Sequence, residues 1–342
     1  MLLNRPLPIE IVGGGPAGLS LGLALRRAGV PVTIFEAGSY PRHRVCGEFI
    51  SGAGDSTVAR LGLREILRDA HPHRTATYHF REQPLRSFSL PATAWGISRY
   101  AFDARLAAAF VAAGGNLQTG ARIPESEAPP GRVFSSGRKP HGESWVGLKV
   151  HVRNLILVSG FEVHLGNRAY VGLSGLETGA VNVCGMFAHR PLAARGAELV
   201  PAYLAAAGMG ALAERLGDAA IDPASFCTTA VTLGDRRVAA PDRIRIGDAC
   251  AAIPAFTGNG LAMALQGAEL TVEPLRAYAF GQSSWEESIR AVGAAQRRRF
   301  SRRLKTAAFL QPFFLEPRLQ RLVAALFNLR LAPIRAFYYA LR

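Results

Sequence analysis

Three glycines near the start of the chain, Gly13, Gly15 and Gly18, follow the spacing G-x-G-x-x-G. Glycine at the first position permits a tight turn, at the second it lets a pyrophosphate approach the backbone, and at the third it lets a helix pack closely on a strand. Glu36 follows Gly18 by 18 residues, where an acidic side chain can accept hydrogen bonds from a ribose. These residue types favour the binding of a dinucleotide, and a glycine-rich structural turn is the alternative.

The segments around these glycines must form a strand, a helix and a second strand to support that chemistry. Residues 9–12 are an apolar strand candidate, 19–28 have helical apolar spacing, and 32–35 are the next strand candidate. The N-terminus of that helix would direct its unpaired N–H groups and the positive end of its dipole toward phosphates. All these elements occur in the required order, so the sequence predicts a dinucleotide site.

A second glycine-rich loop occurs late in the chain. Residues 243–249 form a strand candidate that contains Asp248, and the loop 254–260 leads into a helix expected over 261–272. The N-terminus of that helix offers a second cluster of backbone N–H groups, which can hold a developing negative charge. An ordinary helix-capped turn is the alternative.

Cationic residues and a thiol follow the first strand–helix–strand unit. The loop 40–51 reads Y-P-R-H-R-V-C-G-E-F-I-S and contains Cys46 and Gly47. We favour a loop that runs beside the cofactor over an ordinary polar loop. Arg99 stands at the start of an expected helix that ends at Gly114, where it can face an anion; a solvated arginine is the alternative.

The middle of the chain has a different pattern. A hairpin is expected over 75–80 and 85–90, and helices are expected over 54–69 and 193–216. Five further strand-like runs predict a mostly antiparallel sheet rather than more parallel crossover units. These runs are 145–153, 155–158, 161–165, 169–173 and 180–187. Residues 208–213 resemble a second G-x-G-x-x-A motif, but no strand precedes them, so no second nucleotide site is expected.

We therefore predict an α/β protein with two interleaved domains and a tail. The expected boundaries are 1–74, 92–140 and 225–290 for a discontinuous Rossmann-like domain, 75–91 and 141–224 for a substrate-binding sheet domain, and 291–342 for a helical basic tail.

Charge is concentrated in that tail. The chain has a formal net charge of +15, and residues 297–342 hold eleven basic residues against Glu316 alone. Helices that mix arginines with aromatic residues either lie on anionic membranes or pack on their own protein with the arginines outward, and both alternatives stay open. Nucleic acid is not the expected partner, because no DNA- or RNA-binding motif is present.

The cysteine pattern bears on metal binding and location. Cys46, Cys184, Cys227 and Cys250 are scattered without a C-x-x-C motif, so neither a disulfide framework nor a metal site is expected. The first strand begins by residue 9, which leaves no room for a cleaved leader, and no apolar run reaches the roughly 18 residues of a spanning helix. The expected location is the cytoplasm, with contact at a membrane surface as a further possibility.

Three stretches together resemble a known superfamily. They are G-G-G-P-A-G with Glu36, R-V-C-G-E-F-I-S at 44–51, and I-G-D-A-C-A-A-I-P-A-F-T-G-N-G at 246–260. They are similar to the FAD-dependent oxidoreductases of the geranylgeranyl reductase and aromatic-ring hydroxylase superfamily, the group A flavoprotein monooxygenases. This resemblance implies a glutathione-reductase-type FAD-binding domain interleaved with the sheet domain.

The resemblance also implies a set of cofactor-binding residues. The glycine loop would hold the FAD pyrophosphate, Glu36 the adenosine ribose, and Asp248 the ribityl or pyrophosphate part, while the loop before the late helix would face the isoalloxazine ring. The catalytic residue stays unassigned, with Cys46 as a candidate, and no metal is implied. The complete cofactor set is Gly13, Gly15, Pro16, Ala17, Gly18, Glu36, Cys46, Gly47, Arg99, Asp248, Gly258, Asn259, Gly260 and Leu261.

The implied activity is an oxidation or a reduction of a hydrophobic small molecule, such as a polyketide, isoprenoid or lipid-like aromatic. The leading hypothesis is a monooxygenase that hydroxylates its substrate through a flavin C4a-hydroperoxide, with NAD(P)H as the electron donor. The alternatives are a reductase of carbon–carbon double bonds and a non-catalytic, membrane-associated flavin-binding protein. The chain departs from the superfamily pattern because an Asp-Gly motif is missing in 133–140 and the W-x-W-x-I-P element of flavin halogenases is absent.

Overall fold

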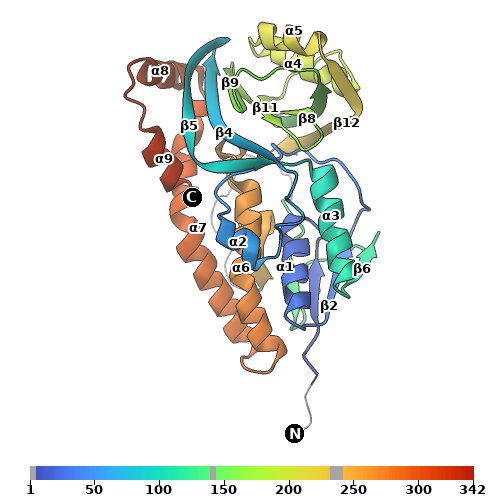
Figure 1. Cartoon of the computed structure of the whole chain (residues 1–342). Helices are drawn as coiled ribbons and strands as arrows, with labels where there is room; N and C mark the ends of the chain where they lie inside the picture. Colours follow the sequence, from blue (N-terminus) through green and yellow to red (C-terminus); the bar gives the residue numbers. More distant parts are fainter. Residues whose placement is uncertain (1–4, 139–143, 232–241) are drawn as a thin grey trace.

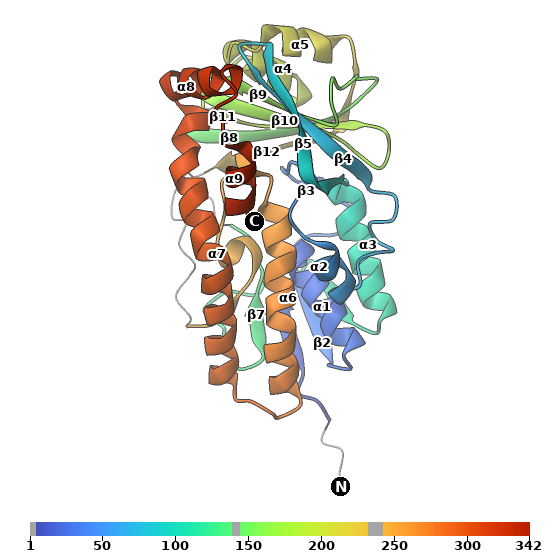
Figure 2. The ribbon, with the colours of Figure 1, turned by 60° about the vertical axis from the view of Figure 1, so that its left-hand side comes forward.

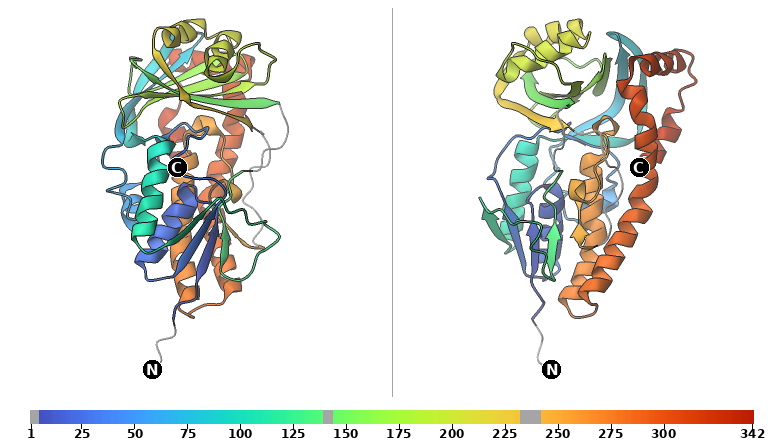
Figure 3. Two further views of the ribbon diagram at one scale, coloured as in Figure 1. Left: turned by 90° about the vertical axis from the view of Figure 1, so that its right-hand side faces the viewer. Right: turned by 180° about the vertical axis from the view of Figure 1, so that it is seen from behind.

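The computed structural model describes residues 5–138, 144–231 and 242–342; positions 139 and 140 of the segment 133–140 lie outside the described residues. Two sheets are stacked along the long axis of the molecule, and the long helix α7 (Trp285–Leu315) runs beside both of them (Figure 1). Figure 3 shows the upper sheet lying across one end of the lower one.

The lower sheet has five parallel strands in the order β13-β7-β1-β2-β6. They are β1 (Ile9–Val12), β2 (Val32–Glu36), β6 (Asn116–Thr119), β7 (Arg132–Phe134) and β13 (Ile244–Arg245). Because parallel strands need crossover connections, one helix carries the chain from β1 to β2 and another leads into β6. Helix α1 (Pro16–Arg27) packs between α3 (Arg99–Ala112) and α6 (Gly260–Ala279), and their apolar side chains form one buried core with the strands.

The upper sheet has eight strands in the order β12-β8-β11-β10-β9-β4-β5-β3. All neighbouring strands are antiparallel except β4 and β9, which are parallel. The strands are β3 (Phe49–Ile50), β4 (His71–Phe80), β5 (Gln83–Gly96), β8 (Trp145–Arg153), β9 (Phe161–Gly166), β10 (Ala169–Gly175), β11 (Val181–Ala188) and β12 (Ala220–Val231). Helices α4 (Leu199–Ala206) and α5 (Gly210–Gly217) cover its outer face.

The basic tail is helical, as predicted. Ser284 and Glu287 form a capping box that starts α7, which continues into α8 (Pro317–Asn328) and α9 (Ile334–Ala340). Figure 2 shows α7 beside α6 and reaching the upper sheet, where α8 contacts β5. No helix in the described parts of the chain combines the length and apolar character needed to cross a bilayer. Contact with a membrane surface stays a prediction.

Three local predictions are corrected by the structure. Residues 155–158 are a loop, because Ile156 and Val158 are 86% and 68% exposed and have no core to cover. The helix expected over 54–69 is only α2 (Asp55–Arg60), because Gly62 has a φ of +69°. The helix expected over 193–216 is divided into α4 and α5 by Gly208, whose φ is +75°. Such a conformation favours glycine and ends a helix.

Candidate functional site

A cavity of about 720 Å³ opens where the ends of β1 and β2 meet the N-termini of α1 and α6. The size is in the range of small-molecule and cofactor sites. The two glycine-rich loops, far apart in the sequence, therefore border one space. The predicted residues in its lining are Gly13, Gly15, Pro16, Ala17, Glu36, Cys46, Arg99, Asp248, Gly260 and Leu261. The predicted residues outside the lining are Gly18, Gly47, Gly258 and Asn259.

The first glycine loop has the shape that a diphosphate requires. A Cβ atom at Gly13 would lie 2.4 Å from the carbonyl oxygen of Ser135, and one at Gly18 would lie 2.1 Å from the carbonyl oxygen of Gly13. Both positions are therefore restricted by protein packing. A Cβ atom at Gly15 would meet only Nη2 of Arg99 at 4.0 Å, because Gly15 faces the cavity. This cradle fits a pyrophosphate group, which needs close approach to the backbone.

Glu36 stands at the end of β2 with its carboxylate buried against the glycine loop. It accepts hydrogen bonds from the backbone N–H groups of Gly14 at 2.7 Å and Gly38 at 2.8 Å, and pairs with Arg42 at 2.7 Å. Burial opposes ionisation, yet these contacts hold the pKa of Glu36 below its usual value. A carboxylate has about four lone-pair sites, so Glu36 fixes the loop and keeps capacity to accept a ribose hydroxyl.

The second glycine loop brings Asp248 and the start of α6 to the opposite wall. Asp248 opens onto the cavity, and its enclosure by the surrounding protein raises the pKa of its carboxyl group. Gly258 has a φ of +62° and turns the chain into α6, where Gly260 and Leu261 face the cavity. The first N–H groups of a helix have no intrahelical partner, so this wall presents hydrogen-bond donors and a positive dipole end.

Asn259 stabilises the same turn. It is fully buried, and its Nδ2 donates a hydrogen bond to the carbonyl oxygen of Thr257 at 2.9 Å. The contact closes the turn before α6. Asn259 therefore shapes the loop from behind rather than lining the cavity.

Arg99 lies beside the glycine loop, but its guanidinium is already engaged. Its Nε and Nη2 donate to the carboxylate of Asp103 at 2.7 and 2.6 Å. Burial would lower the pKa of Arg99, but Asp103 raises it above its usual value, so the side chain stays charged. Arg99 thus brings a fixed positive charge to the cavity, with one nitrogen free of this ion pair.

The loop that carries Cys46 and Gly47 is tied to the upper sheet. The carbonyl oxygen of Cys46 accepts a hydrogen bond from Nδ2 of Asn182 at 3.0 Å, and that of Gly47 accepts one from Oγ of Ser174 at 2.9 Å. Burial raises the pKa of the Cys46 thiol above its ordinary value. Cys46 therefore faces the cavity as a protonated thiol, a poor nucleophile and a weak acid.

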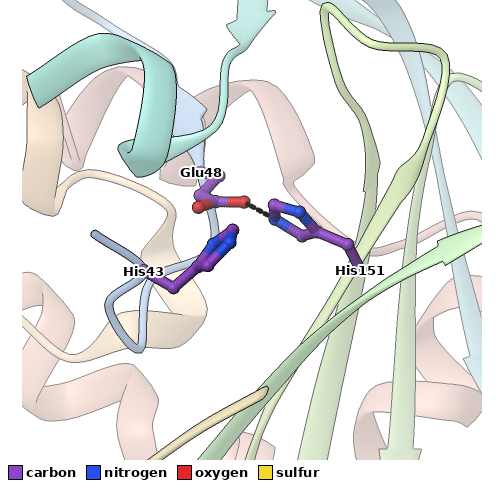
Figure 4. A group of neighbouring side chains, drawn as sticks. All are labelled: His43, Glu48 and His151. Carbon is purple, nitrogen blue, oxygen red and sulfur yellow. Dashed lines mark hydrogen bonds and ion pairs between the residues drawn. The ribbon is translucent and has the colours of Figure 1, made fainter. Parts of the chain in front are cut away.

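A buried cluster of ionisable side chains joins this loop to β8, and the sequence analysis did not find it. Oε2 of Glu48 lies 2.6 Å from Nε2 of His151, and Oε1 lies 3.3 Å from Nζ of Lys149. Nζ of Lys149 lies 3.0 Å from Nδ1 of His43. Figure 4 shows His43, Glu48 and His151 directed toward one another. His43 lines the cavity, so the cluster connects the cavity wall to the sheet.

The charge states in this cluster follow from its burial. Glu48 and Lys149 are fully buried. Burial would raise the pKa of Glu48, but His151 and Lys149 hold it below its usual value. Burial, followed by the charge of Lys149, lowers the pKa of His43 to about 4. One signal was available in the sequence: Lys149, one of three lysines in the chain, interrupts the strand candidate 145–153.

Solved structures with the same arrangement of sheets identify the fold. The structure of Klebsiella pneumoniae HpxO complexed with FAD and uric acid is 16% identical, has a TM-score of 0.77, and covers 98% of this chain and 96% of that chain. p-Nitrophenol 4-monooxygenase PnpA of Pseudomonas putida is 15% identical, with a TM-score of 0.73 and coverage of 98% and 97%. The chain has the fold of the FAD-dependent monooxygenases. The fold predicted from the sequence is thereby confirmed.

Comparisons of sequence also find a nucleotide-binding domain, but they cover less of the chain than the comparisons of structure. A model for an NAD(P)-binding Rossmann-like domain matches residues 11–72. The menaquinone reductase of Mycolicibacterium smegmatis is 26% identical over 125 residues, which are 35% of this chain and 31% of that protein. The chain thus matches less than a third of the length of this curated relative.

Proposed function

We propose that this protein is an FAD-dependent oxidoreductase that hydroxylates a hydrophobic small molecule, with NAD(P)H as the electron donor. One observation carries the proposal: the two glycine-rich loops border a single cavity of about 720 Å³ in the fold that FAD-bound HpxO also has. We include in this proposal every cofactor-binding residue predicted from the sequence. Some of them line the cavity, and the others lie behind its wall and shape it.

The chain's own residues would position the cofactor and its charge. Gly13, Gly15 and Gly18 shape the cradle for the pyrophosphate, and Glu36 would accept a hydrogen bond from the ribose. FAD, when bound, supplies electron transfer between a nicotinamide and either dioxygen or the substrate. Backbone N–H groups at Gly260 and Leu261 would stabilise negative charge on the reduced ring, because such preorganised donors act strongly in a site without water.

The second candidate function is the reduction of a carbon–carbon double bond. The match to a menaquinone reductase favours it, and so does a protonated thiol at Cys46 in the cavity wall. Hydride addition to a double bond requires a proton donor, and the Cys46 thiol would hold a proton in the cavity wall, as a weak acid because burial raises its pKa.

The products of turnover distinguish these two functions. The purified protein with FAD and NADPH or NADH is incubated with menaquinone and a panel of hydrophobic aromatic compounds under dioxygen labelled with heavy oxygen. A product that contains the heavy label supports hydroxylation. A product that has gained two hydrogen atoms at a carbon–carbon double bond, and no label, supports the double-bond reductase, whereas two hydrogen atoms gained at the quinone oxygens do not. Nicotinamide oxidation that depends on none of the substrates argues against both candidates for this panel.

A further inference from the structure

A second buried cluster of ionisable side chains lies away from the cavity. His79 on β4 and His164 on β9 are directly paired across the two parallel strands. Glu162 precedes His164 by two residues, so its side chain projects from the same face of the sheet. None of the three lines the cavity, and their face of the sheet is the one that α5 covers. The topology thus fixes three side chains as neighbours.

The three donor atoms lie close together. Oε2 of Glu162 lies 2.8 Å from Nε2 of His164 and 3.9 Å from Nε2 of His79, and all the donor atoms lie within 4.8 Å of one another. His79 is 5% exposed, and its Nε2 has no hydrogen-bond partner among the described residues. Buried polar atoms are nearly always hydrogen-bonded, so an unpartnered nitrogen aimed at a carboxylate indicates a missing partner.

A tetrahedral zinc ion fits this spacing. Ligand distances of 2.0–2.2 Å place neighbouring donor atoms roughly 3.4 Å apart. The two observed separations from Glu162, 2.8 and 3.9 Å, lie on either side of that value. The rings of His79 and His164 are stacked with their planes 9° apart, so one imidazole must rotate out of the stack before both nitrogen lone pairs point at the same ion. We propose that His79, Glu162 and His164 bind a divalent transition-metal ion, and that Zn²⁺ is the ion that this donor set fits best.

Metal ligands must be deprotonated, so a bound ion needs an ionised Glu162 and a nitrogen lone pair on each histidine. In the structure Nε2 of His164 is instead hydrogen-bonded to Oε2 of Glu162 at 2.8 Å. Binding of an ion therefore replaces this hydrogen bond.

Arg215 on α5 contacts the same carboxylate as the two histidines. Its Nη1 lies 3.2 Å from Oε2 of Glu162, and its Nη2 donates to the carbonyl oxygen of Ile156 at 2.8 Å. The side chain is 31% exposed, so it can turn toward solvent. The guanidinium and the metal ion compete for the same carboxylate oxygen. Binding therefore displaces Arg215 and links β4 to β9 through the ion, which stabilises the upper sheet.

The test uses the full chain after removal of bound metal with a chelator. Calorimetric titration with Zn²⁺ measures affinity and stoichiometry, and Co²⁺ reports coordination through its ligand-field bands in the visible spectrum. We expect one ion per chain, tetrahedral Co²⁺ bands and a higher melting temperature. His79→Ala weakens Zn²⁺ binding by at least about tenfold, while Arg215→Ala strengthens it. His71→Ala, an exposed histidine on the same strand, leaves the affinity unchanged.

The contradicting results are equally specific. Absence of Co²⁺ bands in the wild-type chain, or unchanged affinity in His79→Ala, overturns the proposal. A loss of affinity in His43→Ala, with none in His79→Ala, assigns the binding to the cluster beside the cavity and overturns it too. If His79→Ala does not fold, the wild-type Co²⁺ spectrum and Arg215→Ala decide, because weaker or unchanged binding in Arg215→Ala contradicts the competition described above.

Discussion

The carboxylate of Glu48 lies 2.6 Å from Nε2 of His151, across 103 positions of sequence, and joins the loop beside the cavity to the upper sheet. The other carboxylate oxygen of Glu48 accepts a hydrogen bond from the backbone N–H of Arg99 at 2.8 Å, at the start of α3. One side chain thus connects the cofactor loop, α3 and β8. Ionic and hydrogen-bonding contacts of the buried Glu48 carboxylate therefore stabilise the wall of the cavity.

Glu48→Gln should destabilise the chain by about 3 kcal/mol, because it leaves the buried ammonium of Lys149 without its counter-charge. Urea unfolding measures this loss. Glu273→Gln is the matched control, since its partner Arg276 lies 3.0 Å away but Glu273 is 73% exposed. That control should change the free energy of unfolding by less than about 1 kcal/mol. Equal effects of the two variants would contradict the role of the cluster.

Gly15→Val should weaken FAD binding at least about tenfold, or by about 1.4 kcal/mol, because the new side chain enters the cavity. The melting temperature of the FAD-free protein should stay unchanged, since a Cβ atom there meets only Arg99 at 4.0 Å. Gly13→Ala is the contrasting variant. Its φ of +108° and a contact of 2.4 Å with Ser135 should destabilise the fold itself. A Gly15→Val protein with normal FAD affinity contradicts the cradle.

Glu36 should contribute a pH-dependent part of the stability. Its pKa in the folded chain is below the ordinary value of 4.5, so its contribution is fully present above about pH 4.5 and is lost as the pH falls through the folded pKa. The difference in unfolding free energy between the wild type and Glu36→Gln should therefore shrink as urea unfolding is repeated from pH 7 downward. If the difference in unfolding free energy between the two proteins instead grows as the pH falls, the lowered pKa of Glu36 is contradicted.

Cys46→Ser separates the two candidate functions. If the protein is a hydroxylase, no thiol is needed and the kcat of Cys46→Ser should fall less than about threefold. If Cys46 is the general acid of a double-bond reductase, its loss should lower kcat about 10²-fold or more. FAD affinity should be similar in both proteins. A large loss of kcat with retained FAD affinity assigns Cys46 to proton donation and favours the double-bond reductase. In that case the product should have gained two hydrogen atoms at a double bond and no heavy oxygen.

The sequence predicted the strand and helix elements that carry the proposed site, but it did not predict the contacts between distant parts of the chain. Gly13 and Glu36 belong to one strand–helix–strand unit, whose glycine spacing and apolar periodicity are short-range signals. Glu48 and Lys149 meet only because the fold places the loop before β3 against the middle of β8, and no local pattern encodes that contact. The same holds for His79 and His164, which the strand pairing brings together.

Errors in the predicted elements also have local physical reasons. The apolar run 155–158 has strand-like composition, but Asn154 with a φ of +62° turns the chain away from the sheet. The interval 193–216 has helical composition throughout, yet the backbone at Gly208 adopts the left-handed conformation and divides it. Composition favours an element, and a single residue with positive φ ends it.

The most direct test of the central claim is FAD binding followed by reduction. The visible spectrum of the purified protein, or of the protein titrated with FAD, should show a bound flavin that NADPH or NADH bleaches in the absence of oxygen. Gly15→Val should show that spectrum only at higher FAD concentration. Absence of flavin binding by the wild type would contradict the assignment of the two glycine loops to one cofactor site. A bound flavin that only dithionite reduces would contradict the proposed NAD(P)H-driven turnover and leave a flavin-binding protein without catalysis.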